Sequence, residues 1–367
     1  MGDIILSFAN GASIGSDVTF TNTGGNDFLF QSGGRVSFGA RAHLDGSIYV
    51  FGSGDLTLGA SAFVSGQVYT EGDFSGPIRL EVDDSQFLYN EAGNDGGAIW
   101  AKRMYDEVNL SNTVFDLNEA RYGGALGFNQ QVLFTGTDLD ISSNTAQNSG
   151  GGLYAVEAVM VMLVDSKVRG NRARTSQGGG VYGAYLDETY PAKFLRVNVA
   201  DNSSALEGGG VHYQSVVNST IEESLIEGNE AGNNSFGGGL FADDSAYVKI
   251  RNSVLRSNTA HYGGGAYIND NADGSDFFNN IFLDNDARTG GGFALCNSPY
   301  TLFYNNTVAG NRAMYESSGA AFYNSQVDFR NNIFAHNTGG SALHMYDLNS
   351  AFYAELSHNN FHNNHNF

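Results

Sequence analysis

A short phrase recurs eleven times in this 367-residue chain: an apolar residue, two variable residues and an asparagine. The asparagines of the phrase are Asn90, Asn118, Asn144, Asn171, Asn202, Asn229, Asn258, Asn285, Asn311, Asn337 and Asn364. They lie 26 to 31 residues apart, and a period of this length over most of a chain is typical of a solenoid. In a solenoid each repeat forms one coil that stacks on the coil before it.

A second phrase keeps the same period. It is a glycine-rich turn before an apolar segment, and its copies begin at Gly96, Gly123, Gly150, Gly178, Gly208, Gly237, Gly263 and Gly290. Degenerate copies follow at residues 318–321 and 339–342. Two landmarks with one period and a constant order indicate a single structural unit that is repeated.

The segments between these landmarks have the pattern of short strands. Apolar residues alternate with polar ones, as at Leu195, Val197 and Val199, and turn-forming residues flank them. No stretch has the apolar spacing of a helix, and the chain contains only three prolines. The sequence therefore predicts an all-β fold: a right-handed, single-stranded parallel β-helix of about 14–15 coils, each of roughly 18–31 residues.

Both phrases have a structural explanation. Successive coils of a β-helix lie about 4.8 Å apart, so the repeated asparagines are expected to stack and to hydrogen-bond from coil to coil. Asparagine also tolerates the left-handed backbone angles of a tight bend. Glycine doublets supply positive φ or allow close approach of the backbone. We therefore interpret both features as parts of the scaffold and not as a catalytic signature.

The literal copies of the two phrases are Gly96-Gly97-Ala98-Ile99 and Phe87-Leu88-Tyr89-Asn90. This pair of motifs, GGAI and FxxN, resembles the polymorphic outer-membrane protein repeats known from chlamydial surface proteins. The resemblance covers roughly residues 82–367. It implies a secreted β-helix passenger of the autotransporter kind, often adhesive, although no region of this chain resembles the membrane barrel that follows such passengers.

Residues 1–81 have a different cadence. Apolar pairs recur every six to eight residues between glycines, as in residues 35–40 and 47–52, and the asparagine phrase is missing. We interpret residues 1–81 as thinner coils of the same β-helix and residues 82–367 as the coils of the 27-residue repeat. An independent N-terminal β-domain is the alternative.

The charge of the chain limits its partners. A net charge of −21 argues against nucleic acid, whose phosphates require a basic surface, and favours solubility or cationic partners. The single cysteine, Cys296, cannot form an intrachain disulfide. Neither a signal peptide nor a transmembrane segment is visible in the sequence, which suggests a processed or truncated chain. The predicted location is extracellular or at a cell surface of bacterial type.

A polar column six residues before each asparagine is the candidate catalytic position. Asp138, Asp165 and Arg196 are expected on three consecutive coils, although the 31-residue unit around Arg196 makes its register uncertain. The arrangement is similar to that of β-helix polysaccharide lyases, in which acidic calcium ligands lie near a proton-abstracting arginine. Glycoside hydrolases instead use two or three carboxylates. Because asparagine occupies the column elsewhere, a solvated or capping column is the favoured interpretation.

Calcium is the only cofactor that the sequence suggests. Asn269, Asn271, Asp273 and Asp276 supply oxygen ligands at alternate positions of an acidic loop that resembles the first half of an EF-hand loop. The twelfth position holds Asn280 in place of glutamate, so an ordinary polar turn is the favoured interpretation.

Two further groups of residues have a structural and a functional interpretation. The histidines near the C-terminus are expected to diverge at a frayed last coil and not to bind metal; they are His358, His362 and His365. Three tyrosines that follow the glycine phrase could form a stripe for stacking sugars, but a stacked row within the helix is favoured; they are Tyr182, Tyr213 and Tyr267.

Three functions remain open. The leading prediction is a non-catalytic extracellular β-helix scaffold, such as an adhesin passenger or a cell-surface or fibre structural protein. Its partner would be a glycan or protein on a host or neighbouring cell. The first alternative is a polysaccharide lyase or glycoside hydrolase. The second is a structural protein that self-associates end to end, because the ends of a solenoid are unpaired sheet edges.

Overall fold

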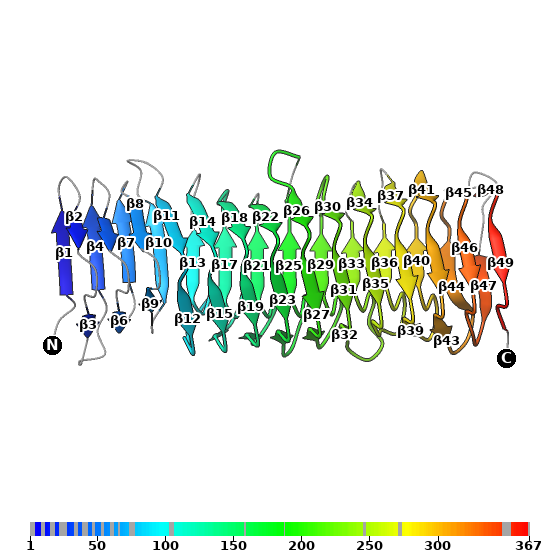
Figure 1. Cartoon of the computed structure of the whole chain (residues 1–367), viewed down its shortest axis with the longest axis horizontal. Helices are drawn as coiled ribbons and strands as arrows, with labels where there is room; N and C mark the ends of the chain where they lie inside the picture. Colours follow the sequence, from blue (N-terminus) through cyan, green and yellow to red (C-terminus); the bar gives the residue numbers. More distant parts are fainter. Residues whose placement is uncertain are drawn as a thin grey trace.

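The structure is a computed structural model. It describes residues 4–8, 12–14, 19–21, 28–32, 36–38, 43–45, 48–52, 55–58, 62–64, 67–72, 78–102, 106–157, 159–186, 188–244, 247–270, 274–346 and 354–365. The described chain is an elongated solenoid with its N- and C-termini at opposite ends (Figure 1). Three parallel sheets of fourteen strands run along it, and each coil contributes one strand to each sheet. This agrees with the predicted parallel β-helix of about 14–15 coils.

We name the three long sheets A, B and C in the order in which a coil enters them. Sheet A contains β1 (Ile4–Phe8), β4 (Phe28–Ser32), β7 (Ile48–Gly52), β10 (Val68–Gly72), β13 (Ile99–Lys102), β17 (Leu126–Asn129), β21 (Leu153–Val156), β25 (Val181–Ala184), β29 (Val211–Gln214), β33 (Leu240–Asp243), β36 (Ala266–Asn269), β40 (Phe293–Cys296), β44 (Ser317–Tyr323) and β47 (Ser341–Tyr346). Sheet B contains β2 (Ala12–Ile14), β5 (Val36–Phe38), β8 (Asp55–Leu58), β11 (Arg79–Asp83), β14 (Glu107–Ser111), β18 (Leu133–Thr137), β22 (Met160–Val164), β26 (Ala192–Leu195), β30 (Thr220–Glu222), β34 (Val248–Arg251), β37 (Ser275–Phe278), β41 (Thr301–Tyr304), β45 (Val327–Arg330) and β48 (Ala354–Ser357).

Sheet C contains β3 (Thr19–Thr21), β6 (His43–Asp45), β9 (Phe63–Val64), β12 (Gln86–Leu88), β15 (Val114–Asp116), β19 (Asp140–Ser142), β23 (Lys167–Arg169), β27 (Asn198–Ala200), β31 (Leu225–Glu227), β35 (Val254–Arg256), β38 (Ile281–Leu283), β42 (Thr307–Ala309), β46 (Ile333–Ala335) and β49 (Asn360–His362). Two short ladders lie between sheet C and the next strand of sheet A. One contains β16 (Glu119–Ala120), β20 (Thr145–Ala146), β24 (Arg172–Ala173), β28 (Ser203–Ser204) and β32 (Glu230–Ala231), and the other contains β39 (Asp286–Ala287) and β43 (Arg312–Ala313).

The coils before and after residue 81 belong to the same sheets. Strand β10 pairs in parallel with β13, β8 pairs with β11, and β9 pairs with β12. The proposed boundary between thin and regular coils at residues 81 and 82 stays a prediction.

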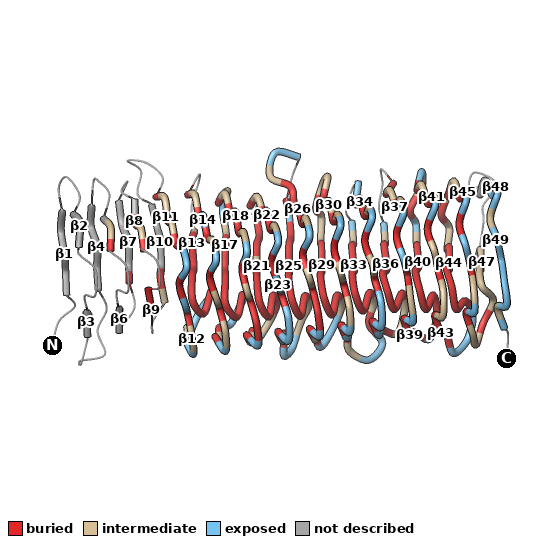
Figure 2. Tube along the Cα trace, in the orientation of Figure 1, coloured by how far each residue is buried: buried red, intermediate tan, exposed pale blue. Residues whose placement is uncertain are grey.

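The core is one continuous apolar column inside the coils (Figure 2). In sheet B, alternate residues point inward, so that Val108 and Leu110 of β14 are buried while Asn109 between them is exposed. Phenylalanines stack on their counterparts from coil to coil, as Phe303 does on Phe329 with ring centroids 5.2 Å apart. Stacked rings of this kind stabilise neighbouring coils against each other.

The predicted asparagine ladder is present. The Oδ1 atom of each asparagine accepts hydrogen bonds from both the backbone N–H and the side-chain amide of the asparagine one coil earlier, as Asn229 does for Asn202 at 3.0 and 2.9 Å. The amide of Asn229 donates to the carbonyl of Val199 and to Oδ1 of Asn258, both at 2.9 Å. The ladder begins at Asn90, whose buried Oδ1 has no hydrogen-bond partner among the described residues.

The left-handed backbone angles are not at the ladder asparagines, so that part of the prediction is wrong. They are at the residue immediately before each one, as at Leu117 (φ 58°) and Ser143 (φ 55°). The preceding residue turns the chain, and this turn points the asparagine side chain into the corner between the coils.

A second ladder, which the sequence did not reveal, runs along the corner between sheets B and C. It lies five residues before the asparagine ladder and uses side-chain oxygens of several residue types. The backbone N–H of Ser224 donates to Oγ of Ser253 at 3.1 Å, that of Ser253 to Oδ1 of Asn280 at 3.0 Å, and that of Asn280 to Oδ1 of Asn306 at 2.9 Å. On successive coils this corner therefore supplies a side-chain acceptor for a backbone N–H that makes no hydrogen bond within the sheets.

Candidate functional site

The predicted polar column lies at the corner between sheets B and C. Its members all have a positive φ, between 45° and 57°, including Asp138, Asp165 and Arg196. Asparagine and aspartate are the residues that most readily adopt this conformation after glycine, which explains their frequency in the column. The register of Arg196 is regular, because the extra residues of its long unit lie in the turn between β25 and β26 (Figure 1).

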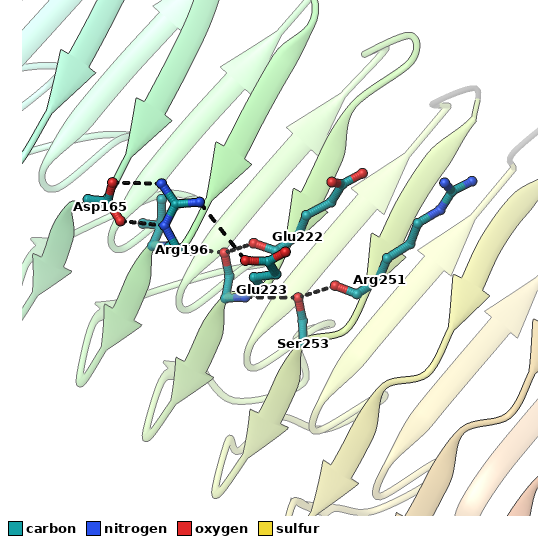
Figure 3. Close-up of polar contacts among 8 residues, drawn as sticks. Asp165, Arg196, Glu222, Glu223, Arg251 and Ser253 are labelled. Carbon is teal, nitrogen blue, oxygen red and sulfur yellow. Dashed lines mark hydrogen bonds and ion pairs between the residues drawn. The ribbon is translucent and has the colours of Figure 1, made fainter.

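The structure brings these candidate residues onto neighbouring coils of one exposed corner. Arg196 donates from Nε and Nη2 to the two carboxylate oxygens of Asp165, at 2.6 and 2.7 Å (Figure 3). Its Nη1 lies 3.9 Å from a carboxylate oxygen of Glu223 on the next coil. The side chains of Arg196 and Asp165 are 46% and 39% exposed, so water competes for both.

This ion pair opposes the chemistry that a lyase needs. The hydrogen bond with Asp165, with the negative charges around it, raises the pKa of the Arg196 guanidinium, which must lose a proton to act as a base. The hydrogen bond from Arg196 likewise lowers the pKa of the Asp165 carboxyl, which makes it a poor proton donor.

The substitution Arg196→Gln tests this pairing. We expect the pKa of Asp165 to return toward the ordinary value of a carboxyl group, followed by the pH dependence of its carboxyl carbon resonance. Because the folded-state pKa is lowered, any stabilisation from the pair is present above the ordinary pKa and is lost as pH falls through the lowered one. The control Arg256→Gln, which removes the partner of Glu227, should leave Asp165 unchanged. An unchanged pKa of Asp165 in Arg196→Gln would contradict the pairing.

Only part of the proposed calcium loop is described. Asn271 and Asp273 lie outside the described residues. The side-chain amide of Asn269 donates to Asp243 at 2.8 Å and to Asp270 at 2.9 Å. A carboxylate oxygen of Asp276 lies 3.5 Å from Nη2 of Arg251. Calcium binding at this loop therefore stays a prediction.

The described residues hold no group of three or more His, Cys, Asp or Glu side chains placed to bind a metal ion. At the C-terminal coil, the ring of His362 instead lies perpendicular to that of His336 on the coil before, with centroids 5.8 Å apart.

The three tyrosines of the predicted stripe do not share one row. Tyr213 is the third residue of β29 and is wholly buried inside the coils. Tyr182 and Tyr267 are the second residues of β25 and β36, so they point to the outer face of sheet A. The outer two are nevertheless covered, each 8% exposed.

The residues of sheet A in register with the second residue of β13 form a column on its outer face, which we call the sheet column. Its members are in register from Trp100 to His344: Trp100, Gly127, Tyr154, Tyr182, His212, Phe241, Tyr267, Ala294, Ala321 and His344. The rings stack along the column, as those of Tyr182 and His212 do with centroids 5.1 Å apart.

The arm is the segment of each coil between the ladder asparagine and the next strand of sheet A, and it covers this column. The arm residues just before the first glycine, or before Ser317 in the last case, form a second column, the arm column: Asp95, Tyr122, Ser149, Gln177, Glu207, Phe236, Tyr262, Thr289 and Glu316. The ring of Phe236 packs on Tyr267 of the sheet column, with centroids 4.8 Å apart.

In both columns aromatic rings give way to smaller or polar side chains at the same coil. The arm column passes from Phe236 and Tyr262 to Thr289 and Glu316, and the sheet column passes from Tyr267 to alanines. A cleft of about 600 Å³ lies at this change, lined by Phe236, His261, Tyr262, Tyr267, Arg288, Thr289, Cys296, Tyr315, Glu316 and Tyr323. The cleft was not predicted from the sequence, although the break can be found once the strands of sheet A are placed in register.

The charged and polar groups of the cleft differ in whether a neighbouring residue already pairs with them and in whether they are charged. The Tyr323 hydroxyl donates to Oε2 of Glu316 at 2.5 Å, so this carboxylate has a partner. Arg288 forms no ion pair with any described residue. Burial and the Arg288 charge lower the pKa of His261, and burial raises the pKa of the Cys296 thiol, so both favour the neutral form.

Comparison with known proteins identifies the fold. No curated protein sequence matches this chain. Among solved structures, the A-module of the mannuronan C-5 epimerase AlgE6 of Azotobacter vinelandii is similar, with 12% sequence identity and a TM-score of 0.37 over 92% of this chain and 91% of that chain. The part of the chain that the structure describes has no helix of the length and hydropathy that a membrane span requires. The family model of the right handed beta helix region matches residues 4–308 and 233–367, and the chain therefore belongs to the right-handed β-helix family.

Proposed function

We propose that this protein is a non-catalytic extracellular scaffold, in the manner of an adhesin passenger or a structural protein of a cell surface or fibre. The observation that carries the proposal is the structural role of the polar column at the corner between sheets B and C. Its side chains belong to left-handed turn residues that recur on every regular coil, and the Asp165–Arg196 pair is neutralised within the corner. A turn residue that recurs on every coil has a structural role, so its presence does not require a role in substrate binding or catalysis.

The reactive side chains of the described region support the same proposal. Arg196 and Asp165 have pKa values shifted away from neutrality, the wrong direction for a base and an acid. Burial lowers the pKa of His212 to about 3, so this ring stays neutral within its aromatic stack. Burial also raises the pKa of Cys296, which makes the thiol a weak nucleophile.

The surface location is part of the proposal and rests on composition. A charge of −21 over an elongated rod suits a protein that must stay dispersed at high concentration. Stability that comes from ladders and stacked rings requires no disulfide, in agreement with the single cysteine. Self-association through the ends of the solenoid stays a prediction.

An activity screen tests the proposal. The purified chain is incubated with neutral, carboxylated and sulfated polysaccharides, and the products are followed by new reducing ends and by absorbance of unsaturated sugars. We expect no turnover above that of a heat-inactivated sample. Turnover that is lost in both Asp165→Asn and Arg196→Gln would overturn the proposal and assign catalysis to the corner.

A further inference from the structure

We infer that the cleft over sheet A binds one or two rings of a glycan that carries a carboxylate or sulfate group, with Arg288 as the anion-binding residue. The inference goes beyond the proposed scaffold function and does not depend on it. A bound glycan could be left intact or processed, and the cleft would be its site in either case.

The cleft lies where the rows of aromatic rings in the arm column and the sheet column end. In the sheet column a ring stands at every position from Tyr154 to Tyr267, and arm rings pack on it, as Tyr122 does on Tyr154 at 4.9 Å and Phe236 on Tyr267 at 4.8 Å. At the next coil Thr289 follows Tyr262 and Ala294 follows Tyr267. The cleft lies beside Thr289, where the arm column has no ring, and its volume of about 600 Å³ is within the range of small-ligand sites.

The walls of the cleft combine aromatic rings with hydroxyl groups. Phe236 and Tyr262 close one end with stacked rings whose centroids are 5.1 Å apart, and Tyr315 and Tyr323 line the other end. The ring of Tyr315 is on the rim, where the residue is 64% exposed. A sugar ring has an apolar C–H face and a rim of hydroxyls, and it matches a wall that presents both aromatic faces and polar edges.

The charge in the cleft favours an anionic sugar. Arg288 has no ion-pair partner among the described residues, and the nearby Glu316 already accepts from Tyr323. Nine of the eleven described arginines form an ion pair, and the two that do not are Arg172 and Arg288. Its planar fork matches a carboxylate or sulfate in a bidentate arrangement, which neutral sugars lack.

The backbone argues against a peptide ligand. Peptides that bind to sheets add a strand at an exposed edge and pair with its free N–H and C=O groups. At the cleft these groups are already used between coils, as in the bonds from Gly263 to Thr289 at 3.0 Å and from Arg288 to His261 at 2.9 Å. Recognition must therefore come from side chains, and the side chains present suit a sugar.

Three tetrasaccharides test the inference, measured by isothermal titration calorimetry and saturation-transfer NMR on the full chain: a hexuronate, a sulfated galactan that carries no carboxylate, and a neutral cellotetraose. We expect the hexuronate, the sulfated sugar or both to bind about tenfold more tightly than cellotetraose, since one charge-assisted contact is worth about that factor. The two anionic arms distinguish carboxylate from sulfate.

Three variants and one control assign the site. Arg288→Gln should weaken the anionic sugar about tenfold and remove the preference over cellotetraose. Thr289→Tyr places at this coil the ring that Tyr262 supplies on the coil before, fills the cleft and should abolish binding. Tyr315→Ala gives the same test at an exposed rim position, with reduced binding expected and little effect on folding. Arg196→Gln, on the remote corner, is the matched charge control and should bind like the unchanged chain.

Three results would overturn the inference. The first is failure of all three sugars to bind at millimolar concentration. The second is equal binding of the neutral sugar together with no effect of Arg288→Gln. The third is full binding by both Tyr315→Ala and a folded Thr289→Tyr, which would place the sugar outside the cleft.

Discussion

Replacement of a central ladder asparagine, Asn229→Ala, is expected to destabilise the solenoid by roughly 4 kcal/mol, since each buried polar group that loses its partner costs about 1–3 kcal/mol. The substitution removes four hydrogen bonds. The backbone N–H and the amide of Asn202 lose their common acceptor, and the carbonyl of Val199 and Oδ1 of Asn258 each lose a donor. Asn229 is only 1% exposed, so water cannot replace these bonds without opening the corner.

Denaturant unfolding followed by circular dichroism measures this effect as a lower midpoint. Asn364→Ala is the matched control, because Asn364 accepts the same two bonds from Asn337 but lies on the last, partly exposed rung. There water can take the place of the amide, and we expect a cost of about 1 kcal/mol or less. Equal losses at the two positions would show that burial of the ladder contributes nothing.

A single methyl group at Gly238 is expected to have a comparable effect, with Gly238→Ala costing roughly 3 kcal/mol through overpacking. The added Cβ would lie 2.5 Å from the carbonyl oxygen of Thr259 and 2.6 Å from that of Gly264, both on the next coil. These are backbone atoms held in the ladder between coils, so the coils must separate locally to admit the methyl group.

Gly93→Ala provides the control for this substitution. Its added Cβ would meet nothing within 4 Å, and we expect a change of at most about 0.5 kcal/mol, in either direction. In Gly238→Ala we also expect a smaller denaturant dependence of unfolding. A defect between two coils weakens the coupling of the two halves of a solenoid, which then unfold separately. A single transition with an unchanged slope and midpoint would contradict the expected clash.

The asparagine ladder could be predicted because it places a strict demand on the sequence. Each rung must present an acceptor and two donors at one point, and only an amide side chain on every coil can do so, as Asn202 and Asn229 illustrate. The second ladder escaped prediction because it needs only one acceptor oxygen per rung. Ser224, Ser253 and Asn280 all supply one, so no single letter repeats.

The left-handed position was misassigned for a related reason. Local geometry requires one such residue in each bend, but Leu117 and Ser143 fill it as well as Asp201 does, with φ between 54° and 58°. A position that tolerates leucine, serine, aspartate and glycine has no signature of its own.

The cleft was not predicted because its lining comes from the arms and strands of several coils, which share no motif there. Ala294 and Ala321 are unremarkable until they are placed in register with the rings of Tyr182 and Tyr267. Grouping Tyr213 with those two tyrosines concealed the register, because a shift of one residue moves a side chain to the opposite face of a strand.

The asparagine ladder also gives the rod a direction. Each amide from Asn118 to Asn337 donates one bond forward to the Oδ1 of the next asparagine and one bond backward to a carbonyl of the preceding coil, as Asn229 does to Asn258 and Val199. Among the described residues the forward series runs from Asn90, whose Oδ1 has no partner, to Asn364, whose amide donates only backward to the carbonyl of Phe334. Aligned amide dipoles of this kind polarise one another along the chain of bonds. The ladder therefore has an acceptor terminus and a donor terminus. A coil inserted by gene duplication would extend the ladder without further sequence changes only if its asparagine also donated toward the C-terminal coil and accepted from the N-terminal one.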